Sequence, residues 1–127
     1  QLNERVNVLL SHLSLATKAK KISIPSKEGF EFLSISAIVR CEADVNYTHV
    51  FTSEGKKYTI SKTLKYFEAL LTPHGFFRIH NSHLVSLGHI KGYAKVGYVV
   101  LKDNTKLEVS VRRRDAFIKA CNGLLGF

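Results

Sequence analysis

Hydrophobic residues alternate with polar ones along most of the chain, from Lys21 to about Val111. This period of two is the signature of β-strands with one buried face. The alternating runs are short: Ile22/Ile24, Phe30/Phe32, Val39/Cys41/Ala43, Tyr47/His49/Phe51, Tyr58/Ile60, Phe77/Ile79 and Leu107/Val109/Val111. Residues that favour tight turns separate them, at positions 25–29, 44–46, 53–55, 91–92 and 103–104. The pattern predicts a mainly β structure made of antiparallel hairpins.

An apolar stripe at helical spacing marks the first twenty residues. Its members are Val6, Leu9, Leu10 and Leu13, and this spacing predicts an amphipathic helix. A short basic stretch, residues 18–21, separates it from the alternating pattern. We therefore divide the chain into residues 1–20, a linker helix, and residues 21–127, a folded domain. Because the sequence opens on Gln1, we expect the linker to continue into a longer parent chain.

Two further segments with helical periodicity interrupt the strand pattern. The first has a residue suited to helix capping at its start, either Ser61 or Thr63, and is ended by Pro73 and Gly75. Its apolar stripe consists of Leu64, Phe67, Leu70 and Leu71. The second covers residues 114–121, and we expect the Asn-Gly pair that follows to stop it.

Composition narrows the class of protein. A length of 127 residues allows one hydrophobic core, and a hydrophobic content of 45% argues against disorder. No apolar run approaches the roughly 20 residues of a membrane span, and no signal peptide is present. Cys41 and Cys121 match no metal-ligand or redox spacing, so we expect two reduced core thiols. These features predict a cytoplasmic domain without a membrane partner.

The charge of the chain is strongly positive and unevenly placed. The formal net charge is +9, and residues 61–127 carry eleven basic against four acidic residues, whereas residues 21–60 are balanced. A one-sided positive field attracts polyanions and raises their encounter rate. We therefore favour a nucleic acid or an anionic surface as partner over a merely solubilising role for the charge.

The most conspicuous polar cluster lies at residues 76–83, where two phenylalanines run into alternating basic and polar residues. His80 and His83, with His74 or His89, could in principle bind zinc. However, no His-Glu-x-x-His helix, cysteine pair or nearby carboxylate accompanies them, so we expect no metal and no other cofactor.

The same cluster allows a catalytic and a binding interpretation. Ser82 beside a histidine could act as a nucleophile, but no orienting acid and no Gly-x-Ser-x-Gly elbow accompany it, so we expect no catalytic residue. His80 and Asn81 lie at the tip of an apolar strand, where their hydrogen-bonding groups point outward. Asparagine suits the reading of adenine or phosphate, and histidine can donate to either.

A second cluster contains three successive arginines. Alternation places Val109 and Val111 on the buried face, so Arg112 points away from the core, and Arg113 and Arg114 then open a helix. A guanidinium offers a planar fork that pairs bidentately with phosphate or guanine. This cluster is therefore a candidate reader of nucleic acid, although a solvated charge run has the same composition.

A third candidate is the short segment at residues 46–49, a turn followed by the start of a strand. Here we expect Tyr47 in the core and His49 exposed.

Four motifs in this order resemble the LytTR-type DNA-binding domain, the output domain of the AlgR/AgrA/LytR family of bacterial response regulators. They lie at residues 42–48, 58–64, 77–85 and 107–113. The resemblance extends from about Lys21 to Leu124. It implies an elongated all-β fold of about ten strands in small antiparallel sheets, with one or two short helices.

The resemblance also implies how the domain works. Loops at strand ends would enter successive major grooves and the intervening minor groove of bent double-stranded DNA, usually as a pair of domains on direct repeats. We accordingly expect a homodimer on DNA, no enzymatic activity, and an N-terminal receiver or sensor domain upstream of the linker helix.

Site residues carry over position by position. His49 matches a base or backbone contact after the Asn-Tyr turn, and Asn81 matches a contact in the Phe-Arg-x-His-x-Ser segment. Arg112 matches the base-reading arginine after the last strand, and Arg113 or Arg114 would contact phosphates.

The chain also departs from the family. Family members often have Lys or Arg in place of Asn81, and Asn-Leu where this chain has Ser86 and Leu87. Arg78 is expected to be structural, paired with Glu42 or Glu68.

Two other functions fit the same residues less well. In an RNA or single-strand binder, Phe76, Phe77 or Tyr47 would serve as stacking platforms rather than as core. A hydrolase or metal enzyme would use the His/Ser cluster.

Overall fold

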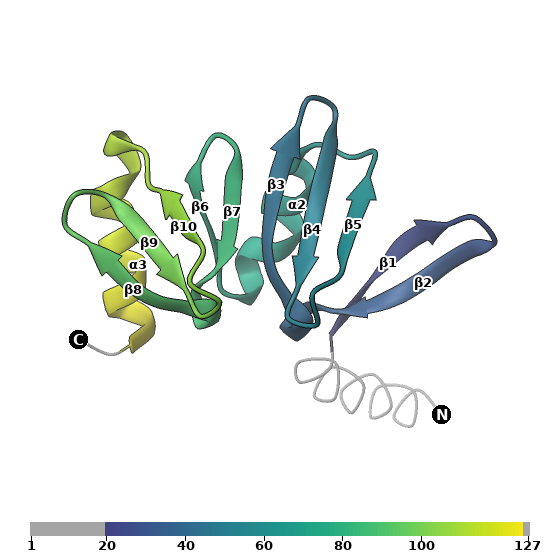
Figure 1. Ribbon diagram of the computed structural model, residues 1–127, viewed down its shortest axis with the longest axis horizontal. Coiled ribbons are helices and arrows are strands. Elements are labelled where there is room, and N and C mark those ends of the chain that lie inside the picture. The colour runs from purple at the N-terminus through teal and green to yellow at the C-terminus, as the bar shows by residue number, and fades with distance from the viewer. Residues whose placement is uncertain (1–19, 126–127) are drawn as a thin grey trace, which may run out of the picture. The chain divides into compact units, whose positions relative to one another are not determined.

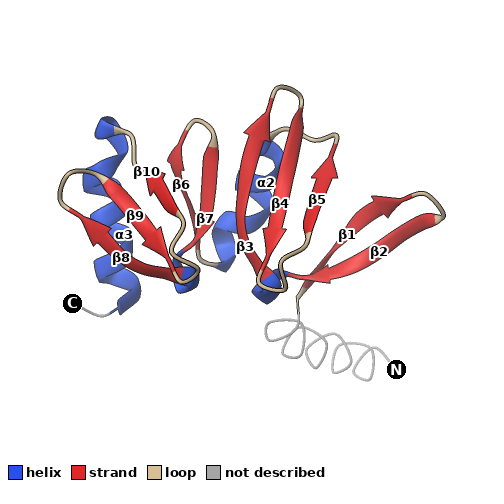
Figure 2. Ribbon diagram, viewed as in Figure 1, coloured by secondary structure: helices blue, strands red, loops and turns tan. Residues whose placement is uncertain are grey.

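The computed structural model describes residues 20–125, and the chain divides into two compact units, Gln1–Ala37 and Ile38–Phe127. Ten strands and two α-helices lie in the described part (Figures 1 and 2), so the predicted class of small antiparallel sheets with short helices is confirmed. The linker helix predicted for residues 1–20 falls outside the described residues, apart from Lys20. Among the described helices, none has the length and apolar character needed to cross a membrane.

The described part of the first unit is a hairpin. Strands β1 (Lys21–Ser26) and β2 (Gly29–Ser34) pair antiparallel, and a 3₁₀ turn, η1 (Ile35–Ala37), follows. Gly29 follows the turn and has a φ of 141°, a backbone conformation that would be strained for a residue with a side chain. Ile22 and Ile24 of β1 are buried.

The second unit contains a five-stranded antiparallel sheet in the order β5-β4-β3-β7-β6. Its strands are β3 (Ile38–Asp44), β4 (Tyr47–Thr52), β5 (Lys57–Ile60), β6 (Phe76–His80) and β7 (His83–Ser86). Helix α2 (Leu64–Leu71) connects β5 to β6 and contacts β3, β6 and β7 with an apolar face that buries Leu64, Phe67 and Leu71.

A three-stranded sheet, in the order β10-β9-β8, and a second helix complete this unit. These elements are β8 (Ile90–Ala94), β9 (Tyr98–Leu101), β10 (Lys106–Glu108) and α3 (Arg114–Leu125). Three 3₁₀ turns join the parts: η2 (Thr72–His74), η3 (Leu87–His89) and η4 (Val111–Arg113). One buried cluster links both sheets to α3: Ile79, Val85, Val99, Leu101, Leu107, Val109 and Phe117.

The predicted ends of α2 are confirmed. The Thr63 side chain accepts a hydrogen bond from the backbone N–H of Tyr66, so Thr63 rather than Ser61 is the N-cap. Gly75 adopts the left-handed conformation after η2, with φ of 85°. The predicted stop of α3 at residues 122–123 is wrong, because the helix continues to Leu125. A glycine inside a helix costs only about 0.5–1 kcal/mol, and Gly123 keeps a negative φ.

Two local predictions in the C-terminal part are also wrong. The expected turn at residues 91–92 lies inside β8, where the pairing with β9 shifts by a bulge between Ile90 and Gly92; the chain reverses later, at Gly97. Val111 is 73% exposed rather than buried. Strand β10 ends at Glu108, and the 3₁₀ turn η4 that contains Val111 no longer follows the alternation of a strand.

Both cysteines are free thiols, as predicted. Cys41 is fully buried, and this burial raises the pKa of its thiol to about 12. Cys121 is only half-buried on α3, so it is not a full member of the core.

Candidate nucleic-acid interface

The end of β6 and the turn that leads to β7 carry two of the predicted site residues: His80 ends the strand, and Asn81 lies in the turn. Arg78 fixes this turn from within: its Nη1 donates to Glu68 Oε1 of α2 at 2.9 Å, its Nε to the His80 carbonyl at 3.3 Å, and its Nη2 to the Asn81 carbonyl at 2.6 Å. Its side chain is only 18% exposed. The predicted structural role of Arg78 is therefore confirmed, with Glu68 as its partner; Glu42 pairs with Arg40 instead, at 2.9 Å.

Asn81 and Arg112 come together at this turn although they are far apart in sequence. Both residues are exposed, and Arg112 Nη2 lies 3.5 Å from Asn81 Oδ1. The connection is made just before Arg112, where the backbone N–H and the hydroxyl of Ser110 both donate to the Ile79 carbonyl, at 2.8 and 3.3 Å. The structure thus places an amide and a guanidinium side by side on one surface.

Arg113 and Arg114 are half-buried and partly engaged inside the molecule. Arg113 Nη1 donates to the Arg78 carbonyl at 3.3 Å, and its buried Nε has no hydrogen-bond partner. Arg114 Nε donates to the Val109 carbonyl at 3.1 Å, and its guanidinium packs directly on Gly97, where a Cβ atom would overlap it. Because a guanidinium has five N–H donors, each of these bonds leaves others for a phosphate.

His49 lies on β4, and both of its ring nitrogens have partners within the sheet region. Nδ1 lies 2.9 Å from Thr59 Oγ1, and Nε2 lies 2.9 Å from Asp44 Oδ2. The expectation for this strand is reversed: Tyr47 is 50% exposed, whereas the His49 side chain is only 18% exposed. The reason is that Thr48 occupies the buried face, where its hydroxyl donates to the Lys62 carbonyl at 2.7 Å.

Strand register joins His49 to the turn residues through a row that the sequence analysis missed. His49 is directly opposite Glu42, Glu42 is opposite His83, and His83 is opposite His80. Side chains at paired positions point to the same face, so these four form one line across β4, β3, β7 and β6. The next pair along β6 and β7 is Arg78 and Leu84, and Arg78 reaches Glu68 of α2. Because neighbouring pairs face opposite sides of a sheet, the four-residue row lies on the face opposite α2. Only the register between strands distant in sequence could have revealed this row.

The two histidines that flank this turn, His80 of β6 and His83 of β7, have different surroundings. His80 Nδ1 accepts a hydrogen bond from the Ser82 backbone N–H at 3.1 Å, and the His80 and His83 ring centroids are 5.5 Å apart. His83 Nδ1 is buried without a partner. Burial lowers the pKa of His83 below its usual value, while the nearby Glu42 carboxylate opposes this shift. No group of three or more metal-ligating side chains occurs in the described part of the chain.

Comparison with known proteins gives three likenesses. A family model described as LytTr DNA-binding domain matches residues 28–122. The CO-responsive transcriptional regulator RcoM of Rhodospirillum rubrum is 30% identical over 76 residues, which are 60% of this chain and 32% of RcoM, so the match spans about a third of that relative. The LytTr DNA-binding domain of a Bacillus cereus protein, described as a methyl-accepting/DNA response regulator, superimposes with a TM-score of 0.66 and 26% identity. That match covers 84% of this chain and 97% of the other.

Proposed function

The chain belongs to the family of LytTr DNA-binding domains, and from that premise we propose that it binds double-stranded DNA sequence-specifically as the output domain of a bacterial transcriptional regulator. The observation that carries the proposal is the juxtaposition of Asn81 and Arg112 on an exposed surface. An amide and a guanidinium are the two side-chain groups best suited to read adenine and guanine edges in a major groove.

Internal contacts support a reading role for these two side chains. Arg78 holds the backbone of the β6–β7 turn through two carbonyls, and Ser110 fastens the Arg112 segment to β6. Base recognition requires side chains held on a rigid support, because misplacement loses the directional hydrogen bonds. We call these bonds from Arg78 and Ser110 the clamp. The clamp would hold Asn81 and Arg112 at a fixed distance from each other while both side chains remain exposed.

The remaining site residues are assigned around this pair. Arg113 and Arg114 would contact phosphates with the guanidinium N–H groups that their internal bonds leave over, and His80 would donate to the backbone or a base beside Asn81. His49 would contact DNA from the other end of the row formed by His49, Glu42, His83 and His80, which we call the histidine row. Its ring nitrogens there contact Asp44 and Thr59. A net charge of +7 over residues 61–127 supplies the attraction to the DNA backbone.

The proposal extends to the assembly that the domain works in. Two copies would bind direct repeats as a homodimer, in the cytoplasm, without enzymatic activity. A receiver or sensor domain would precede residues 1–20 in the parent chain. The shortness of the match to RcoM, about a third of that protein, is consistent with a domain that works as part of a longer regulator.

The surroundings of two aromatic rings argue against RNA or single-strand binding by stacking. Phe76 is buried, and the Phe77 ring packs against Phe117 with centroids 5.7 Å apart. Phe76 therefore presents no free face to a base and Phe77 only part of its ring, whereas Tyr47 is 50% exposed and is the one of the three rings that stacking could use.

Selection of bound duplexes from a random pool tests the proposal. The selected duplex is then compared with a shuffled duplex, a single strand of the same sequence and an RNA hairpin by fluorescence anisotropy. We expect the selected duplex to bind at least about a hundredfold more tightly than the shuffled one, because specific and non-specific affinities commonly differ by 10³ or more. Equal binding of the single strand and the duplex would refute duplex recognition.

A further inference from the structure

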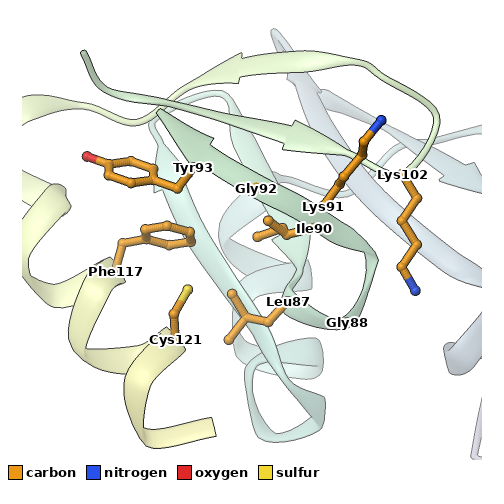
Figure 3. A pocket seen from close by; sticks show the side chains of 9 residues that line it. All are labelled: Leu87, Gly88, Ile90, Lys91, Gly92, Tyr93, Lys102, Phe117 and Cys121. Carbon is orange, nitrogen blue, oxygen red and sulfur yellow. The ribbon is translucent and has the colours of Figure 1, made fainter. Parts of the chain in front are cut away.

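A pocket of about 400 Å³ lies in the C-terminal part of the second unit (Figure 3). Helix α3, the turn η3 and strand β8 supply most of its walls. One further lining residue, Lys102, directly follows the end of β9. Its lining residues are Leu87, Gly88, Ile90, Lys91, Gly92, Tyr93, Lys102, Phe117 and Cys121. None of the residues of the candidate DNA interface is among them, so the pocket is a separate feature of the domain.

One end of the pocket is apolar. The Phe117 ring lies 5.5 Å from the Tyr93 ring, measured between centroids, and Figure 3 shows Leu87 and the Cys121 thiol beside Phe117. Phe117 itself is buried in the core cluster, so this wall is fixed by packing rather than by a mobile loop. A wall of this kind is typical of sites that hold the apolar part of a small ligand.

The other end of the pocket is positive. Lys91 and Lys102 both line it, both are exposed, and they come from the side away from α3 (Figure 3). The Lys91 amine donates to Asn104 Oδ1 at 2.7 Å, and the two lysine amines point in different directions in Figure 3, so a carboxylate that contacts both draws at least one lysine side chain into a new rotamer. None of the nine lining residues carries a carboxylate. The positive charge of Lys102 also reaches His89 of η3, whose pKa is lowered by burial and by this lysine.

We propose that this pocket binds a small amphipathic carboxylate, with its apolar part against Leu87, Tyr93 and Phe117 and its carboxylate at Lys91 and Lys102. The volume lies within the 300–1,000 Å³ typical of small-molecule sites. The apolar end favours an apolar group, and two lysines in a lining that contains no carboxylate favour an anion. A medium-chain fatty carboxylate combines both properties in one molecule, and octanoate is the probe of choice.

The test uses the whole 127-residue chain, labelled with ¹⁵N, and follows amide resonances during titration with octanoate below its micelle concentration. We expect saturable shifts that centre on residues 87–93, 102 and 117–121. Octanol, which has the same chain without the charge, should bind more weakly. Octylammonium, which carries the opposite charge, should bind weakest. Equal binding of all three compounds, or shifts centred elsewhere, would overturn the proposal.

Two variants with equal net charge separate the lysine contribution from general electrostatics. Lys91→Ala combined with Lys102→Ala should weaken octanoate binding about three- to tenfold, as expected for two exposed ion pairs, and should leave octanol binding unchanged. Lys95→Ala combined with Lys119→Ala removes two exposed lysines outside the pocket and should change neither. An equal loss in both double variants would refute the site.

A filled pocket provides an independent check. Cys121 lies on α3, lines the pocket beside Phe117 and is half-buried, so Cys121→Phe adds bulk at the apolar end. We expect this variant to keep a cooperative melting transition and to lose octanoate binding. Undiminished binding by a folded Cys121→Phe protein would show that octanoate lies elsewhere. Protein-concentration-dependent shifts of the same residues without octanoate would show that a second copy covers the pocket, and would also overturn the proposal.

Discussion

At the scale of single residues, the arginines of the candidate interface differ in how many hydrogen bonds they make within the protein. Arg78 uses all three guanidinium nitrogens on Glu68 and on two carbonyls of the turn, whereas Arg112 makes one long contact, to Asn81. The sequence shows four similar cations, Arg78 and Arg112–Arg114. The structure distinguishes an exposed one from three that are partly buried. This difference determines which substitutions should change DNA recognition and which should change folding.

Replacement of Arg112 by alanine should affect recognition alone. Because Arg112 is exposed and supports no other backbone segment, we expect Arg112→Ala to keep the melting temperature and to weaken the selected duplex by about 1–3 kcal/mol. Anisotropy titrations with selected and shuffled duplexes measure the effect. Lys119→Ala, on the exposed part of α3, is the matched loss of one positive charge. A loss that is the same on both duplexes would make Arg112 a phosphate contact.

Replacement of Arg78 by alanine should act through the turn. The change leaves the Glu68 carboxylate and the His80 and Asn81 carbonyls without their donor, so we expect a loss of about 2–4 kcal/mol in the free energy of unfolding. DNA binding should weaken as well. Chemical denaturation measures the stability, and Arg40→Ala, which breaks the Arg40–Glu42 pair on the same sheet, is the comparison. Unchanged DNA affinity in folded Arg78→Ala protein would show that the turn needs no clamp.

The pKa of His83 predicts a pH dependence of stability. Burial lowers this pKa below 6.5 in the folded protein, so the unfolded chain takes up a proton first as the pH falls. The folded state is therefore favoured above pH 6.5 and loses stability below it. His89, whose pKa is also lowered, acts in the same direction. In denaturation curves between pH 8 and pH 5, His83→Gln should reduce the slope of stability against pH below that of the unsubstituted protein. An unchanged slope in His83→Gln would contradict the assignment.

At the scale of elements, the sequence predicted correctly those hairpins and helices whose ends are set by nearby turn or capping residues. The β1–β2 and β3–β4 hairpins, and helix α2 with its cap, follow from alternation, turn residues and a hydroxyl at the right position. Strands β8 and β9 lacked such a signal: a glycine bulge interrupts the first, and the second is a continuous apolar run without alternation. The histidine row was also out of reach, because it depends on pairing between β3 and β7.

The cap of α2 gives a prediction at this scale. Thr63 accepts the Tyr66 N–H at 3.3 Å, whereas Ser61 lies outside the helix. Thr63→Ala should therefore lower the free energy of unfolding by about 1 kcal/mol, and Ser61→Ala should change it little. Urea denaturation of both variants measures the difference. Equal losses would mean that the helix starts elsewhere or that the cap is not formed in solution.

At the scale of the whole molecule, the charge asymmetry connects the residue and element scales to DNA affinity. The excess of +7 over residues 61–127 covers α2, both strands of the clamped turn, the three-stranded sheet and the arginine cluster. An attraction of this kind is independent of DNA sequence and decreases with salt, whereas discrimination between sequences is the role that we propose for Asn81 and Arg112. The net charge predicts a polyanionic partner, and the exposed Asn81–Arg112 surface is the one that we propose selects among DNA sequences.

Salt dependence tests this separation and the proposed pairing on direct repeats together. On a duplex with one site, a domain that contacts three or four phosphates should show a slope of roughly −3 in log K against log salt concentration, because each contact contributes about −0.9. On a duplex with two repeats, two copies should bind, and the overall slope should double. Anisotropy titrations from 50 to 300 mM salt (roughly the range over which such contacts are lost) provide both values. A flat slope would contradict phosphate neutralisation. An unchanged slope on the double site would show that one copy alone occupies the repeats, because a second bound copy must release a second set of counterions.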